Sequence, residues 1–109
     1  MASGIQVTAV TTATTTTVAS APASGLIFRI GEGMFVIRNN ANTSVTFDLH
    51  INDGASRKIL TITIPKNSNW TNSAGEKIDW VLGSSDSIEA VTVGTPDLVF
   101  MVSKLEGAE

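Results

Sequence analysis

The stretch that decides the fold is Val45-Thr46-Phe47-Asp48-Leu49-His50-Ile51-Asn52. Its apolar residues, Val45, Phe47, Leu49 and Ile51, alternate strictly with polar ones. Successive side chains of a β-strand point to opposite faces, so this period of two places one face on a core and the other in solvent or at an interface. No helix separates the same residues in this way, because its period is about 3.6 residues. The segment therefore predicts a half-buried strand.

Similar segments lie on both sides of this stretch, and turn-forming residues separate them. The predicted turns are Gly31-Glu32-Gly33, Asn39-Asn40-Ala41-Asn42, Asn52 to Ser56, Gly83 to Asp86 and Gly94 to Asp97. The predicted strands are residues 5–9, 26–30, 34–38, 43–52, 57–64, 78–82, 87–93 and 98–105. The polar stretch 66–77 is predicted to be a loop. We therefore predict an all-β fold, an antiparallel β-sandwich that is jelly-roll-like, with about eight short strands.

The N-terminal segment, residues 1–20, is rich in Thr, Ala and Val, and we separate it from a β-sandwich domain over residues 21–109. Ile5 to Ala9 alternates like a strand, whereas Thr11 to Thr17 is polar on both faces, which specifies strand register weakly. One interpretation is a first strand followed by a loosely held connection. The other is an extended assembly arm that pairs with a strand edge of a neighbouring subunit. Under the arm interpretation the candidate interface residues are Ile5, Val7, Thr14 and Thr16.

The composition argues against several classes of function. The chain has no Cys, which excludes a disulfide framework, a thiolate zinc site and a cysteine nucleophile. Seven basic residues against ten acidic ones, a formal net charge of −3, argue against a nucleic-acid partner. No apolar run approaches the roughly 20 residues of a membrane span, so no membrane partner is expected. The N-terminus lacks the basic start and apolar core of a secretory signal.

No group of residues predicts catalysis, a cofactor site or a metal site. Asp48, His50 and Asp53 have the character of metal ligands, but a transition-metal site usually needs three or four protein groups and solvated polar residues explain them more simply. His50 is the only histidine, and no Gly-x-Ser-x-Gly elbow presents a serine to it. Gly31-Glu32-Gly33 lacks the third glycine of a dinucleotide site. Asp86 fits a turn in which an Asp side chain caps the backbone. We expect no enzyme activity.

The two tryptophans have different predicted roles. Trp80 fits a core or rim position of a strand. Trp70 lies among polar residues, and its ring is either tucked under the loop or exposed as a binding anchor that stacks on a sugar or docks into a neighbouring protein. Trp70 and Asn72 of this Asn-rich stretch complete the candidate interface residues.

The C-terminal third carries a pattern that resembles a known family. Gly75-Glu76-Lys77-Ile78-Asp79-Trp80-Val81-Leu82 leads into Ser85-Asp86-Ser87-Ile88-Glu89-Ala90, and Leu98 to Glu106 is the final strand. Two earlier stretches that fit the same outline are Phe35-Val36-Ile37-Arg38-Asn39-Asn40 and Leu49-His50-Ile51-Asn52-Asp53-Gly54. From Ala21 to Glu106 the chain resembles the small β-sandwich accessory structural proteins of tailed bacteriophage virions. It departs from them by having Gly83-Ser84-Ser85 where an Ala-Gly step is usual.

The resemblance implies a non-enzymatic virion protein, assembled in the host cytoplasm. The expected function is capsid decoration or cementing, in which the sandwich and the N-terminal arm bind and stabilise the assembled shell. The expected partners are the major capsid protein or other virion proteins, together with further copies of this chain in a homo-oligomer. Strands that are largely apolar on both faces, such as Ile27 to Ile30, favour an assembly protein, because the fold or a partner must cover both faces. The alternatives are a neck, tail or fibre component, and a host-glycan-binding module that uses Trp70.

Overall fold

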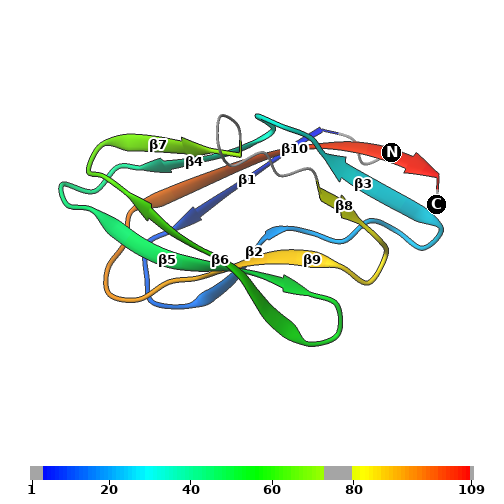
Figure 1. Cartoon of the computed structure of the whole chain (residues 1–109), viewed down its shortest axis with the longest axis horizontal. Helices are drawn as coiled ribbons and strands as arrows, with labels where there is room; N and C mark the ends of the chain where they lie inside the picture. The colour runs from blue at the N-terminus through cyan, green and yellow to red at the C-terminus, as the bar shows by residue number, and fades with distance from the viewer. Residues whose placement is uncertain (1–3, 73–79, 109) are drawn as a thin grey trace.

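The chain folds into two antiparallel β-sheets that pack face to face (Figure 1). The computed structural model describes residues 4–72 and 80–108, which contain ten strands. The strands are β1 (Gly4–Val10), β2 (Thr15–Ala19), β3 (Leu26–Ile30), β4 (Phe35–Asn39), β5 (Val45–Asn52), β6 (Ser56–Ile64), β7 (Ser68–Thr71), β8 (Trp80–Leu82), β9 (Ser87–Val91) and β10 (Leu98–Ala108). The predicted all-β antiparallel sandwich is confirmed. This described part has no helix, and so no helix long and apolar enough to span a membrane.

The strand β10 organises the first sheet. That sheet has the order β7-β4-β10-β3-β8, with β1 also paired to β10, and the second sheet has the order β2-β9-β5-β6. β1 pairs with β10 from Gly4 opposite Lys104 to Val10 opposite Leu98. β4 and β3 pair with successive parts of β10, the first over residues 98–102 and the second over residues 105–108. Because successive side chains of a strand alternate, one face of β10 lies on the core and the other lies on the outside of the sandwich.

The two sheets meet in one aromatic and aliphatic core. The ring of Phe35 makes edge-to-face contacts with Trp70, Trp80 and Phe100, at centroid distances of 6.2, 5.4 and 6.5 Å. Phe47 of the second sheet meets Phe100 at 5.6 Å in the same geometry, which aromatic pairs prefer. The other buried hydrophobic residues are Val10, Val18, Ala19, Phe28, Ile30, Ile37, Leu49, Ile62, Ile64, Leu82, Ile88, Ala90, Leu98 and Val102.

The N-terminal segment supplies one strand to each sheet. Residues 4–10 form β1 in the first sheet, and residues 15–19 form β2, which pairs with β9 in the second. The prediction of a loosely held connection from Thr11 to Thr17 is therefore wrong for its second half. Val18 and Ala19 at the end of β2 are fully buried, and these two residues anchor an edge strand whose exposed positions are Thr15 and Thr17.

The predicted polar loop over residues 66–77 contains a strand that the pattern did not indicate. Ser68–Thr71 forms β7, which pairs with β4 from Asn39 opposite Ser68 to Val36 opposite Thr71. Residues 73–77 of that prediction lie outside the described residues, as do the first two residues of the predicted strand 78–82. β7 and β2 bring the count from the predicted eight or so to ten.

Candidate interaction surface

The outward face of β10 carries apolar side chains. Phe100 and Val102 point into the core and are fully buried, so their neighbours Val99 and Met101 point away from it. Met101 is 39% exposed. This face is apolar because the sequence of β10 is apolar at every position from Leu98 to Val102 and not only at alternate ones.

The neighbouring strand β1 continues this apolar surface. Val10 is buried in the core, so alternation directs Ala9, Val7 and Ile5 outward. Ile5 and Val7 are each 63% exposed. The polar residues of β1 have the opposite orientation and face the inside of the sandwich.

Strand register joins these side chains into one patch. Val7 lies opposite Met101, and Met101 lies opposite Val36 of β4, while Ala9 lies opposite Val99. Residues directly opposite each other on one face have their Cβ atoms about 5 Å apart, close enough for the side chains to touch. We call this surface the outer apolar patch, and its residues are Ile5, Val7, Ala9, Val36, Val99 and Met101.

Polar and charged groups border the outer apolar patch. Arg38 lies opposite Val99, and its guanidinium donates to the carbonyl oxygen of Asn67 at 2.8 Å and to the side chains of Asn40 and Asn69. These bonds hold the guanidinium along the sheet at the patch margin. An apolar centre with a polar rim is the usual composition of a protein–protein interface.

A buried lysine lies beneath the patch, on the inner face of β10. Lys104 Nζ donates to Gln6 Oε1 at 2.8 Å and lies 4.4 Å from the centroid of the Phe28 ring. Gln6 Oε1 also accepts a hydrogen bond from the backbone N–H of Ser20 at 3.0 Å. The amide of Gln6 therefore ties β1 both to β10 and to the end of β2. Burial lowers the pKa of Lys104 from its ordinary value of 10.5.

This lowered pKa predicts a pH dependence of stability. Between the lowered pKa and 10.5 the unfolded chain binds more protons than the folded chain, so the free energy of unfolding rises with pH in that window. The slope for one group is at most about 1.4 kcal/mol per pH unit. We expect urea titrations to show this rise for the wild type and for Lys58→Met, whose lysine is exposed, and to lose it for Lys104→Met. A rise that persists in Lys104→Met would assign it to another group. The chain has no Tyr and no Cys to titrate nearby.

The three residues that have the character of metal ligands each have a separate partner. Asp48 accepts a hydrogen bond from the Thr61 hydroxyl at 2.7 Å, and His50 Nδ1 is 2.9 Å from Ser56 Oγ. Asp53 pairs with Arg57 at 3.2 Å, and this guanidinium holds the pKa of the Asp53 carboxyl below its ordinary value. Within residues 4–72 and 80–108, no three His, Asp or Glu side chains form a group that could hold a metal ion.

The turn predicted at Asp86 is confirmed by its hydrogen bonds. Asp86 Oδ2 accepts from the backbone N–H of Gly83 at 2.9 Å, and the Asp86 N–H donates to the Gly83 carbonyl oxygen at 3.0 Å. The side chain is thus used in the turn between β8 and β9.

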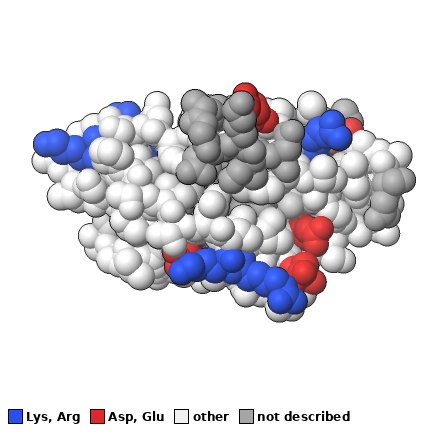
Figure 2. All heavy atoms as spheres, viewed as in Figure 1, with Lys and Arg blue, Asp and Glu red and all other residues white. Residues whose placement is uncertain are grey.

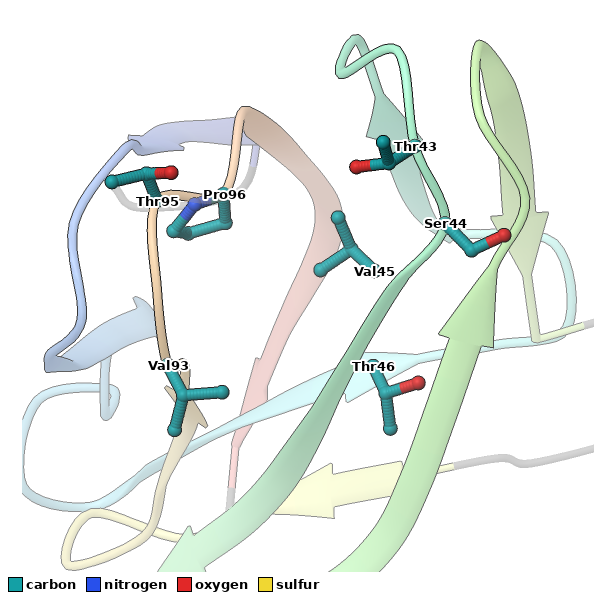
Figure 3. Close-up of a pocket in the computed structure, with 7 residues that line it drawn as sticks. All are labelled: Thr43, Ser44, Val45, Thr46, Val93, Thr95 and Pro96. Carbon is teal, nitrogen blue, oxygen red and sulfur yellow. The ribbon is translucent and has the colours of Figure 1, made fainter.

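A hollow of about 340 Å³ opens between the start of β5 and the connection from β9 to β10. Figure 3 shows the side chains around it, and all seven lining residues are uncharged: Thr43, Ser44, Val45, Thr46, Val93, Thr95 and Pro96. Hydroxyl, methyl and ring groups can hold a ligand or a partner side chain, but none of them is a general acid or base near neutral pH.

Charged side chains are sparse on the face drawn in Figure 2, where they form small separate groups divided by uncharged surface. Both ion pairs of the described residues belong to β5, β6 and the turn between them: Arg57 with Asp53, and Lys58 with Asp48 at 3.9 Å. Such exposed pairs contribute little to stability. Over its described residues, the face drawn in Figure 2 therefore has no broad field of one sign that would attract a charged partner.

The structure places the sequence-predicted interface residues in different environments. Ile5 and Val7 belong to the outer apolar patch. Thr14 is exposed in the connection between β1 and β2, and Thr16 is half-buried opposite the buried Ala90. Thr14 and Thr16 therefore do not form one surface with Ile5 and Val7.

Asn72 and Trp70 have inward positions, and the prediction that Asn72 lies at a surface is wrong. Asn72 is fully buried, with its side chain accepting from the Phe35 N–H at 3.1 Å and donating to the Gly31 carbonyl oxygen at 3.0 Å. Trp70 lies opposite the buried Ile37 and packs half-buried against the core. Val99 and Met101 were not predicted as interface residues, although the two-sided apolar pattern of their strand was a signal for them.

No protein-family model and no curated protein matches the chain. Solved structures share its fold. The pili that form Bacillus endospore appendages, described as disulfide-linked, match over 99% of this chain and 91% of theirs, with a TM-score of 0.53 and 12% identity. The nucleoplasmin-like N-terminal domain of Drosophila FKBP39 matches over 98% and 92%, at 0.53 and 10%. PirA matches over 94% and 95%, at 0.56 and 11%. At these identities the likeness shows a shared small β-sandwich fold.

Proposed function

We propose that this protein is a non-enzymatic structural protein of a tailed bacteriophage virion, a cement protein that binds the assembled capsid shell through the outer apolar patch. The observation that carries the proposal is the run of outward apolar side chains across β1, β10 and β4, with Val7 63% exposed at its edge. Contiguous exposed apolar surface of this kind marks interaction sites in proteins.

The physical basis of the proposal is the transfer of apolar surface out of water. Covering the patch with a partner stabilises the complex by about 25 cal/mol for each Å² of apolar surface buried. A specific interface needs about 1,000 Å² or more, so the partner must also cover the polar rim around Arg38. A protein that binds only the assembled shell then stabilises the shell by mass action.

The comparison with pili supports an assembly role, and the composition of this chain limits the kinds of contact that it can make. The matched proteins share this fold and form pili that are described as disulfide-linked. This chain has no Cys, so it cannot use disulfide links. Its contacts with neighbouring subunits would be the non-covalent ones that an apolar patch and strand backbones supply.

Shell binding tests the proposal. We expect the wild type to co-sediment with assembled empty shells of the phage that encodes it and to raise their melting temperature, without binding free capsid subunits. Met101→Lys should weaken shell binding at least about tenfold, because it brings a charge into an apolar interface. The matched control is Ile59→Lys on β6, since Ile59 is 39% exposed, as Met101 is, but lies in the other sheet.

Equal binding by both variants would contradict the role of the outer apolar patch, and no binding to shells by the wild type would contradict the cement function. Binding to purified necks, tails or fibres in place of shells would favour the neck, tail or fibre alternative. The glycan-binding alternative rested on an exposed Trp70, and the inward packing of that ring against Phe35 does not favour it.

A further inference from the structure

The strand β1 forms an edge of the first sheet. It pairs with β10 along its whole length of seven residues, and no strand among residues 4–72 and 80–108 pairs with its other side. The outer row of backbone N–H and C=O groups of β1 is therefore available to another strand. An open row of this kind is a template for pairing between chains.

Natural edge strands usually carry features that prevent such pairing, such as charged residues, Pro, bulges or a very short length. β1 has none of them, because Gly4–Val10 contains no charged residue and no Pro, and its register with β10 is unbroken. The other edges differ. β2 has a register shift between Thr17 and Ala19, β6 carries Arg57 and Lys58, and β7 has only four residues. The edge strands β2, β6 and β7 thus each carry such a feature, and β1 carries none.

We propose that a second copy of this chain pairs with β1, so that two β1 strands run antiparallel across a two-fold axis and join the two first sheets into one. An axis through Val7 sets Val7 opposite Val7 and Ile5 opposite Ala9 on the outer face, with Gln6 opposite Thr8 on the inner face. The contact is isologous, the commonest arrangement in homodimers. It also satisfies the open backbone groups of both edges.

The side chains of β1 are complementary to a second copy of the same strand, and the charge of β1 permits this occupant. Each chain has a net charge of −3, so two copies repel each other over most approaches. β1 itself is uncharged, and pairing along it brings no like charges face to face. The exposed Ile5 and Val7 gain apolar neighbours from the second copy, and the outer apolar patches of the two chains become continuous. This dimer does not require a capsid shell, so its test is independent of the test of the cement function.

The test is the mass of the full chain in solution. Sedimentation equilibrium of the wild type should give about twice the chain mass of 11.4 kDa. Val7→Lys sets two like charges opposite each other at the axis and should raise the dimer dissociation constant at least about tenfold, with an unchanged circular dichroism spectrum. Ile59→Lys on β6 is the control and should remain dimeric. A monomeric wild type at millimolar concentration, or a Val7→Lys dimer of unchanged affinity, would overturn the inference.

A second pair of variants separates edge pairing from docking through the face of the sheet. Since the chain has no Cys, one introduced Cys can form a disulfide only with another copy. Val7→Cys should cross-link on mild oxidation, because the two residues lie opposite each other at the axis, whereas Met101→Cys should not. Cross-linking through Met101→Cys alone would replace edge pairing with face-to-face docking.

Discussion

Replacing Phe35 with alanine should lower the free energy of unfolding by about 4 kcal/mol. Phe35 is fully buried, and its ring touches Trp70, Trp80 and Phe100. Truncation removes the apolar transfer energy of the ring, leaves a cavity and ends these edge-to-face contacts. Single small domains have unfolding free energies of about 5 to 15 kcal/mol, so this one change removes a large share of the total.

Urea titration followed by tryptophan fluorescence measures the loss, because both tryptophans of the chain contact the Phe35 ring. Phe35→Leu keeps most of the apolar volume and should cost clearly less than the alanine variant. Val93→Ala is the surface control, since Val93 is 71% exposed, and it should change stability by no more than about 0.5 kcal/mol. A Phe35→Ala cost as small as that of Val93→Ala would show that the ring is not at the centre of the core.

The alternation of apolar and polar residues made a strand such as β5 predictable, because one of its faces is buried. In β5, Phe47 and Leu49 are buried while Thr46 is exposed, as the period of two predicted. A slip of one residue would exchange the two faces, so burial of one face fixes the register. The predicted turn after β5 is also present, with Gly54 at a φ of 112° that glycine adopts without strain.

The strands β2 and β7 escaped prediction because partners distant in the sequence define them. Thr15 to Thr17 has no alternation of its own, and it becomes a strand because β9 offers an edge more than 70 residues later. Asn72 is similar, since a polar residue in a polar stretch gives no sign of burial. Its position follows from a hydrogen bond to the Phe35 N–H, 37 residues away. Local sequence patterns therefore indicate neither the pairing of β2 nor the burial of Asn72.

Only part of the outer apolar patch could be predicted from the sequence. Alternation in Ile5 to Ala9 indicated an apolar face, and the apolar run of β10 indicated two such faces. Which face lies outside depends on strand order, because β1 reaches Met101 only by pairing with β10. Strand order between the two ends of a chain is a non-local property, and pattern reasoning does not supply it. Hence Ile5 and Val7 were selected from sequence, whereas Val99 and Met101 were not.

Asn39 is the polar residue whose replacement should have the second large effect. It is fully buried at the end of β4, and its Nδ2 donates to the carbonyl oxygens of Thr43 and Ile64, each at 3.0 Å, and of Pro65 at 3.2 Å. Its Oδ1 accepts from the Ala41 N–H at 2.9 Å. One side chain thus links the end of the first sheet to the start of β5 and to the end of β6. Removing it leaves buried backbone groups without partners, at about 1 to 3 kcal/mol each.

Asn39→Asp keeps the size of the side chain and replaces the donor with a carboxylate that faces the same three carbonyl oxygens. We expect a loss of about 4 kcal/mol in the free energy of unfolding at pH 7. Because this site disfavours the charged form, the folded-state pKa of the new carboxyl should lie above its ordinary value of about 3.9. The folded variant then binds more protons than the unfolded one in that window, so its deficit should shrink as the pH falls toward about 4. Asn40→Asp, an exposed neighbour, should cost no more than about 0.5 kcal/mol at either pH. A deficit for Asn39→Asp that is small, or independent of pH, would mean that the three carbonyl groups do not converge on this side chain.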